Sequence, residues 1–382
     1  MKILLLGEYS RLHNTLKEAL VLLGHEVVLV GTGDSFKQFP SDFDVSSRLE
    51  KKWFSKKIGV LIYKLFSYNI FAKEVYFNLK KLLPVLRNFD VVQLINEDSF
   101  GIDSLDEINF YKIIFKQNNK VFLSACGEDF HTINFYKQNG MRYSILTPFE
   151  QNPSLKNEFL YSFKYLKDDY KVLHDYLMRK IVGIIPSDMD YHIPYLGFPK
   201  AVPMIPNPIN IDNIKYNPLD ISGKIVIFFG INLLSYYKKG SHIILNVLDR
   251  INNDFSDKVE IILAQNLPYD EYMEKYNEAH IFIDQLYSYD QGFNALEAMA
   301  RGKCVLTGAE TEFEDYYKLQ KQVAVNVLPN ENDLYQKIID LIQQPELIKT
   351  IGSNARYFIE KHHDYKKVAQ QYLQIWGGNS AI

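Results

Sequence analysis

A polar glycine turn that leads into a short apolar helix is the segment of the sequence most suited to chemistry. It lies in the run Asp284 to Thr307, DQLYSYDQGFNALEAMARGKCVLT, with a helix predicted over Gly292 to Arg301. The first backbone N–H groups of a helix have no partner within the helix, and they favour negative charge. A turn that leads into a helix is able to bind an anionic group through its backbone amides.

Two adjacent lysines precede a second predicted helix. Lys238 and Lys239 lie between a strand predicted over Lys224 to Phe229 and a helix predicted over Gly240 to Arg250. Cationic side chains stabilise nearby negative charge, so this pair is a candidate for contacting an anionic group. The alternative is a pair of surface lysines whose stems lie on apolar surface.

The elements that must position these residues alternate between strand and helix. Lys2 to Leu6 is a continuous apolar run, Ser10 to Leu23 has helical spacing, and Glu26 to Val30 is again apolar, so the first 33 residues predict a β-α-β unit. Further apolar runs that alternate with helical stretches follow at 91–95, 121–125 and 181–186. This alternation is typical of a parallel sheet buried on both faces.

A proline-rich segment divides the chain. VPMIPNPIN, over Val202 to Asn210, has three prolines in nine residues and excludes regular helix. The strand and helix alternation restarts after it. We therefore predict an N-terminal domain over 1–207, a C-terminal domain over 208–358, and a final helix over about 359–382 that packs back on the first domain.

Length and composition agree with two packed domains. The chain has 382 residues, 47% of them hydrophobic, and a net charge of -3, which offers no global field for nucleic acid. Its two cysteines, Cys126 and Cys304, have neither CxxC spacing nor the number for a disulfide framework, and they suit a reducing cytoplasm. No run approaches the ~18 apolar residues that span a bilayer, so we expect a soluble or peripheral protein.

The run after Asp284 resembles the donor-domain signature of retaining glycosyltransferases with the GT-B fold. The closest form is family 4, the glycosyl transferases group 1, whose pattern is EGFGLxxLEAMAxGxPV. Gly292 matches the second glycine and Glu297 the second glutamate, and the residues from Ala298 to Lys303 match the trailing segment. Tyr289 and Asp290 stand where the family has its first glutamate and first glycine.

Two further segments share this resemblance. IFFGINLLSYYKKG, over Ile227 to Gly240, is similar to the family's VGRLxxxKG, with Lys239 and Gly240 matching and Ile231 in the place of the arginine. The segment from Ile205 to Asn210 resembles the IPNPID hinge between the family's domains. The resemblance implies two Rossmann-like doubly wound parallel-sheet domains that face an interdomain cleft.

The resemblance also implies roles for residues of the C-terminal domain. Glu297 would bind the ribose hydroxyls, and its alternative is a carboxylate on a solvated helix face. Lys239 would neutralise the leaving diphosphate. The family also uses an arginine for this, which is absent here, and Asn232 or Lys238 would do part of its work. The donor sugar would be held by the turn from Tyr289 to Asn294, whose members are Tyr289, Asp290, Gly292, Phe293 and Asn294.

Residues of the N-terminal domain would face the acceptor. Gly7 and Glu8 occupy the first β-α turn, where the family has a glycine loop near the phosphates and the acceptor. Asp129 is the last residue of the segment from Ser124 to Asp129, which resembles the family's HGxD or WGSD, and a helix N-cap is its alternative role. His131 lies nearby and is expected either to contact the sugar or to be packed or solvated.

Other site classes lack support in the sequence. Asp188-Met189-Asp190 and Asp42-Phe43-Asp44 mimic a DxD metal site, but that motif is frequent by chance and the resemblance is to a metal-independent class. We expect no metal, no cofactor beyond the nucleotide-sugar co-substrate, and no GxSxG, Walker A or HExxH chemistry.

A local basic and aromatic patch lies in the first domain. Residues Arg48 to Arg87 include ten basic and two acidic side chains, interleaved with aromatic residues such as Trp53 and Phe54. Such clusters are attracted to anionic lipid, so this segment predicts a peripheral membrane surface. The alternative is one or two amphipathic helices packed on the domain with their lysines outward.

The expected function is transfer of a sugar from a nucleotide-sugar to a hydroxyl acceptor with retained configuration. A glycan or lipid-linked acceptor in surface-polysaccharide synthesis is the expected setting, in the cytoplasm or at the inner face of the membrane. Two alternatives stay open: a non-catalytic GT-B partner subunit, because the first glutamate and the arginine are missing, and a sugar-nucleotide epimerase.

Overall fold

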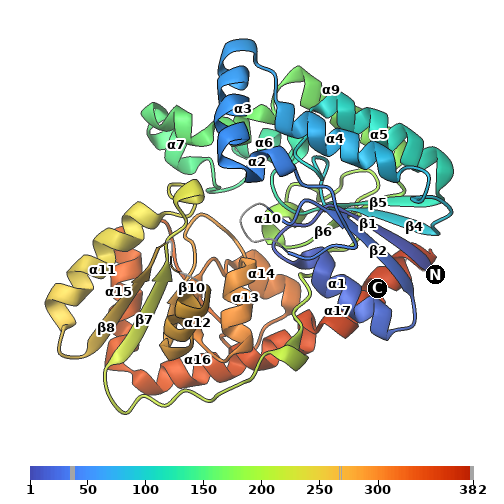
Figure 1. Cartoon of the computed structure of the whole chain (residues 1–382). Coiled ribbons are helices and arrows are strands. Elements are labelled where there is room, and N and C mark those ends of the chain that lie inside the picture. Colours follow the sequence, from blue (N-terminus) through green and yellow to red (C-terminus); the bar gives the residue numbers. More distant parts are fainter. Residues whose placement is uncertain (35–38, 266, 268, 379–382) are drawn as a thin grey trace.

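The chain folds into two α/β halves that lie side by side (Figure 1). The computed structural model describes residues 1–34, 39–265, 267 and 269–378. Each half is built around a parallel sheet covered by helices on both faces. The fold class predicted from the alternation of strands and helices is therefore confirmed.

Six parallel strands form the N-terminal sheet within the described residues, in the order β3-β2-β1-β4-β5-β6. The strands are β1 Lys2–Leu6, β2 Glu26–Gly31, β3 Phe43–Asp44, β4 Val91–Leu94, β5 Lys120–Ala125 and β6 Gly183–Pro186. The strand order reverses between β1 and β4, as in a Rossmann fold.

Alternate residues of β1 face opposite layers of helices because side chains alternate along a strand. Leu4 and Leu6 pack with apolar residues of α4, α5 and α9, whereas Ile3 and Leu5 pack with α1 and α17. The helices of this half are α1 Leu12–Leu22, α2 Arg48–Lys51, α3 Trp53–Phe66, α4 Ile70–Leu82, α5 Ser104–Gln117, α6 Phe130–Lys137, α7 Thr147–Gln151, α8 Leu160–Lys164, α9 Asp168–Lys180 and α10 Met189–His192.

The C-terminal sheet has the order β11-β10-β9-β7-β8 within the described residues, and it reverses between β7 and β9. Its strands are β7 Ile225–Gly230, β8 Val259–Ala264, β9 Ile281–Ile283, β10 Cys304–Thr307 and β11 Val325–Asn326. The helices after β7 are α11 Ser241–Phe255, α12 Tyr269–Glu278, α13 Phe293–Ala300, α14 Thr311–Tyr317, α15 Glu331–Gln343, α16 Pro345–Phe358 and α17 Tyr365–Gly377.

Two chain segments cross between the halves side by side. Ile209 donates its backbone N–H to the His363 carbonyl oxygen at 2.7 Å, and the Tyr365 N–H donates to the Ile209 carbonyl oxygen at 3.1 Å. The second segment then continues into α17, which lies against α1 of the N-terminal half (Figure 1). Trp376 of α17 is fully buried there and donates its indole N–H to Gln93 of β4.

Several boundaries differ from the sequence-based expectations. α1 begins at Leu12 rather than Ser10 because Ser10 and Arg11 have positive φ, 49° and 70°. The strands β3 and β11 have two residues each, too few to give a periodic signal, and they were not predicted. The basic segment from Arg48 to Arg87 forms three helices rather than one or two.

Candidate functional site

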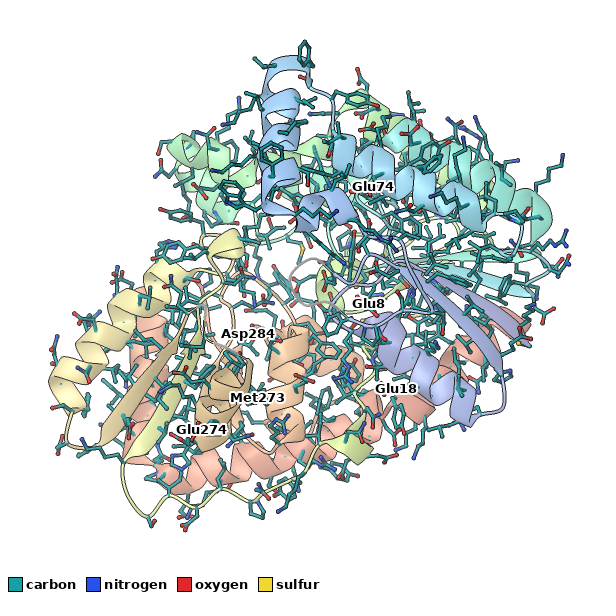
Figure 2. All side chains as sticks on the ribbon, in the orientation of Figure 1. Glu8, Glu18, Glu74, Met273, Glu274 and Asp284 are labelled. Carbon is teal, nitrogen blue, oxygen red and sulfur yellow. The ribbon has the colours of Figure 1, made fainter. Side chains whose placement is uncertain are left out.

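The candidate site lies where the carboxyl ends of the two sheets face each other. In open parallel sheets, ligands bind outside these ends at the point where the strand order reverses. In the N-terminal sheet β1 ends at this point and is followed by Gly7 and Glu8, and in the C-terminal sheet β9 ends there and is followed by Asp284. Figure 2 shows Glu8 and Asp284 in different halves, each on the side turned toward the other half.

Lys239 and Asp284 form an ion pair at the reversal point of the C-terminal sheet. The Lys239 ammonium donates to Asp284 Oδ1 at 2.7 Å, while the Gly292 backbone N–H donates to Asp284 Oδ2 at 3.3 Å. Asp284 is 4% exposed, and a Cβ built on Gly292 would lie only 2.8 Å from its Oδ2. One buried carboxylate therefore joins the predicted lysine to the glycine turn, and only a glycine allows this close approach.

Two helices begin at this ion pair. α11 starts after Lys239 and Gly240, and α13 starts after Gly292; neither has a side-chain cap on its first backbone N–H groups. The hydroxyl of Ser241 at the start of α11 is buried without a hydrogen-bond partner among the described residues. Uncapped helix starts beside a lysine form a site suited to an anion.

Glu297 lies in the second turn of α13 and is half-buried rather than on a solvated face. Burial raises the pKa of its carboxyl, while the positive charges of Arg301 and of Arg11 lower it. Arg11 belongs to the turn before α1, so its field reaches Glu297 from the other half of the molecule.

The turn predicted to hold the donor sugar is in contact with residues of the N-terminal half. The Tyr289 hydroxyl accepts the backbone N–H of Arg142 at 2.8 Å, and the Arg142 guanidinium lies 4.7 Å from the Tyr289 ring centroid. Arg142 also pairs with Glu310 at 2.7 Å and with Glu312 at 2.5 Å, and Tyr143 donates to Glu310. Tyr289 therefore forms part of an interdomain contact at the family's first-glutamate position.

The neighbouring aspartate completes a reciprocal contact between the halves. Asp290 Oδ2 accepts the Met189 N–H at 3.2 Å, and Asp190 Oδ1 accepts the Tyr289 N–H at 2.9 Å. Burial raises the pKa of Asp188 to about 6 and that of Asp290 to about 8, and the pKa of Asp190 is also raised by burial. The sequence motif set aside as a chance DxD is thus part of the domain contact, beside the donor turn.

The remaining donor-side candidates have different surroundings. Lys238 pairs with Glu128 across the two halves. Asn232 is exposed, and its side chain accepts the Leu234 N–H at 3.0 Å, which caps a short 3₁₀ turn. Phe293 is half-buried and Asn294 is exposed, with its carbonyl oxygen accepting the Tyr276 hydroxyl at 3.1 Å.

Glu8 is buried beside the first β-α turn with one unsatisfied oxygen. Its Oε2 accepts the backbone N–H and the side-chain amide of Asn14, at 2.8 and 2.6 Å, while its Oε1 has no partner among the described residues. Burial raises the pKa of Glu8 to about 7. Gly7, at φ +81°, leaves no room for a side chain, because a Cβ would lie 2.3 Å from Ile95.

Asp129 and His131 are held by the packing of the N-terminal half. Asp129 caps α6 by accepting the Thr132 N–H at 2.6 Å, and it also accepts the Tyr195 hydroxyl at 3.1 Å. The His131 ring bonds the Pro194 carbonyl oxygen at 2.8 Å and packs on Tyr195. These contacts correspond to the alternative readings of both residues, a helix N-cap and a packed histidine.

Sequence reasoning missed the partners of the predicted residues. No pattern of spacing in the sequence includes these partners, which are Asp284, Glu310, Arg11 and Arg142. Their positions at strand ends and in turns were the one sequence feature that could have indicated a site. For the described residues, no group of three or more His, Cys, Asp or Glu side chains is arranged to hold a metal ion.

This chain is similar in sequence and in fold to known proteins. Residues 240–374, which include Gly240, the glycine turn and most of α17, match a family described as glycosyl transferase-like. Among curated protein sequences, none matches this chain.

The fold is shared with several solved structures. HepE from Anabaena, in complex with UDP and glucose, is similar over 99% of this chain and 100% of its own, with a TM-score of 0.59 and 12% identity. Sucrose-phosphate synthase from Thermosynechococcus elongatus has a TM-score of 0.55 at 12% identity over 99% of both chains. A putative UDP-N-acetylglucosamine 2-epimerase from Listeria monocytogenes has a TM-score of 0.50 at 11% identity over 98% of this chain and 94% of its own.

The chain therefore has the GT-B fold, and its resemblance to GT-B glycosyltransferases of group 1 is confirmed.

Proposed function

We propose that this protein is a retaining, family 4-like glycosyltransferase that transfers a sugar from a UDP-sugar to a hydroxyl acceptor. The observation that supports this most is the ion pair of Lys239 and Asp284 between the uncapped starts of α11 and α13. UDP is chosen because HepE, similar in fold, was solved with UDP and with UDP-glucose. The retained configuration rests on the resemblance to family 4.

In the proposed complex, the diphosphate binds between the two helix starts. Lys239 exchanges Asp284 for a phosphate oxygen and stabilises the charge that grows on the leaving UDP. Glu297 accepts hydrogen bonds from the ribose hydroxyls, and Gly292 with its neighbours Phe293 and Asn294 lies beside the sugar. Because a lysine and two helix starts supply the positive charge, the proposed reaction needs no metal ion.

The acceptor approaches from the N-terminal half. Glu8 lies at the reversal point of that sheet with its Oε1 unpaired, and at a pKa of about 7 it is able to take or give a proton near neutral pH. We place Glu8 and Gly7 on the acceptor side. A glycan or lipid-linked acceptor at the inner face of the membrane, in surface-polysaccharide synthesis, completes the proposal.

The first test is binding and turnover with matched variants. UDP at a hundred times its dissociation constant is expected to add about 2.7 kcal/mol to the stability of the wild-type protein, whereas ADP and GDP add less. Lys239→Ala is expected to slow transfer by about 10²-fold, and Glu297→Gln to weaken UDP binding by about tenfold. Lys258→Ala and Glu278→Gln change exposed residues of the same half and should leave both quantities unchanged.

Two outcomes would contradict the assignment. Wild-type turnover in both site variants would place the reaction elsewhere. UDP-sugar binding without transfer or hydrolysis would favour a non-catalytic GT-B subunit. The observation that supports this alternative is the contact of Tyr289 with Arg142, because Tyr289 stands at the position of the family's first glutamate. Conversion of the UDP-sugar without any acceptor would indicate an epimerase.

A further inference from the structure

Helix α3 presents an apolar stripe to solvent. Phe54, Ile58, Leu61 and Leu65 follow one another at intervals of four, three and four residues, so they lie on one face of the helix. They are 70, 42, 56 and 65% exposed. A stripe at this spacing is normally the face that a helix buries, yet here it points away from the protein.

The opposite side of α3 already provides its attachment to the domain. Every residue of α3 is described, and Gly59 is the one that is buried. A Cβ on Gly59 would lie 2.2 Å from Phe71 of α4, so the two helices approach closely at this glycine. The stripe thus takes no part in holding α3 to the fold, in contrast to α4, whose Ala72, Val75 and Leu79 are buried.

The helix stands at the edge of the molecule. Figure 1 shows α3 projecting beyond α2 and α4 on the outer side of the N-terminal half. Trp53 and Phe66, at its two ends, are 71 and 74% exposed. Large exposed apolar side chains that form one continuous surface mark an interaction site.

The charges around the stripe specify the chemistry of the partner. Lys52, Lys56, Lys57 and Lys64 are all exposed, and within the described part of the chain none of them has a carboxylate partner. The Lys57 ammonium lies 4.0 Å from the Trp53 ring centroid. Glu74, one of the two acidic residues between Arg48 and Arg87, is bonded to Ser47 and to the Leu49 N–H. The surface is therefore apolar and cationic together.

We propose that α3 docks this protein on an anionic lipid bilayer. Phe54, Ile58, Leu61 and Leu65 enter the boundary between headgroups and acyl chains, and the flanking lysines contact anionic headgroups. At 14 residues α3 is about 21 Å long, and no helix among the described residues is long and apolar enough to cross a membrane, so α3 lies in the interface.

The docking surface is connected to the candidate site by a short segment. β3 ends at Asp44 on the carboxyl edge of the N-terminal sheet, and α2 begins four residues later at Arg48. The membrane would thus hold a lipid-linked acceptor close to that edge. This last step rests on the proposed function, whereas lipid binding does not.

The test is flotation of the full-length protein with vesicles. Binding to vesicles of phosphatidylcholine with phosphatidylglycerol is expected, with loss at high salt and weak binding to phosphatidylcholine alone. Leu61→Glu should lower the bound fraction at least tenfold. Leu22→Glu is the control, because Leu22 is 65% exposed on α1, on the opposite face of the sheet from α4. This variant should bind the vesicles as the wild type does.

A second pair of variants tests the charges. Lys57→Gln with Lys64→Gln should weaken binding to the anionic vesicles, whereas Lys321→Gln with Lys361→Gln, two exposed lysines of the C-terminal half, should not. Absence of vesicle binding by the wild type overturns the proposal. A second result would also overturn it: the wild type does not bind vesicles but forms a dimer without lipid, and Leu61→Glu converts this dimer to a monomer. In that case α3 would contact a second copy of the chain.

The two proposals fail separately. UDP binding and transfer to a water-soluble acceptor should be unchanged in Leu61→Glu, because the stripe is exposed and outside the candidate site. Vesicle binding without any turnover would contradict the proposed reaction alone, and turnover without vesicle binding would contradict the docking proposal alone.

Discussion

At the scale of single residues, the proposed reaction requires Lys239 to exchange one partner for another. Its ammonium is paired with Asp284, which also accepts the Gly292 N–H. A diphosphate placed between α11 and α13 would compete with this buried carboxylate for the same ammonium. In this proposal Asp284 is a positioning residue that keeps the lysine in place at some cost to ligand binding.

Replacing this carboxylate with its amide tests the competition. In Asp284→Asn the amide oxygen still accepts the Gly292 N–H, but the negative charge beside the diphosphate is lost. We expect UDP to bind about fivefold more tightly, which corresponds to about 1 kcal/mol. Isothermal titration calorimetry measures the change, and weaker binding would mean that holding Lys239 in position matters more than the competing charge.

At the scale of elements, the last helix completes the first domain. Tyr372 and Trp376 of α17 pack beneath β1 together with Leu16 and Leu20 of α1. The Trp376 indole N–H donates to Gln93 Oε1 at 3.1 Å, and this bond satisfies a buried polar side chain of β4. The N-terminal half is therefore incomplete without residues that lie after the C-terminal sheet in the sequence.

The two tryptophans of the chain provide a matched comparison of burial. Trp376→Ala removes a fully buried side chain and leaves Gln93 without its donor, so we expect a loss of about 3–5 kcal/mol in the free energy of unfolding. Trp53→Ala changes a side chain that is 71% exposed, and its effect should lie within about 0.5 kcal/mol. Urea unfolding followed by circular dichroism measures both values.

At the scale of the whole molecule, the two halves exchange hydrogen bonds around three carboxyl groups, of which Asp290 is buried and the other two are half-buried. Asp290 accepts from Met189, Asp190 accepts from Tyr289, and Asp188 lies beside them at the end of β6. The hydroxyl of Tyr317 is also buried, and burial together with the negative charges of Asp290 and Asp188 raises its pKa. Contact between the halves therefore brings three carboxyl groups together, and burial raises the pKa of each of them.

This cluster predicts how stability varies with pH. The pKa of Asp290 is raised from 3.8 to about 8, so between these values the folded protein keeps a proton that the unfolded chain has released. The free energy of unfolding therefore falls as the pH rises from 3.8 to about 8. Asp290→Asn removes the dependence, and its melting temperature should exceed that of the wild type by a margin that grows from pH 5 to pH 8. A margin independent of pH would show that Asp290 is ionised in the folded protein.

Much of the fold could be predicted from sequence because its signals are local. β1, β2 and β7 are runs of apolar residues, and their predicted bounds agree with the structure to within one residue. The glycine turn at Gly292 and the lysine before Gly240 were located by the same kind of short pattern. The prediction that Arg48 to Arg87 packs as amphipathic helices with outward lysines describes α4, but α3 exposes an apolar stripe as well.

The partners within the site could not be predicted in this way. Lys239 and Asp284 are 45 residues apart, and Tyr289 and Arg142 are 147 residues apart. Asp188 and Asp190 resembled a chance metal motif, and their place against the donor turn followed from the position of β6 at the edge of its sheet. The carboxylate roles expected for Asp129 and Glu8 depended on burial, which a single sequence does not give.

The sequence by itself thus determined the strands, the helices, the glycine turn and the lysine, because each depends on residues within a few positions along the chain. Only the tertiary structure decided which carboxylate pairs with Lys239, that Tyr289 meets the opposite half, and that the stripe of α3 stays exposed. The physical reason is that pairing and burial depend on distances in space, and these are set when two sheets and the segments that cross between them pack together.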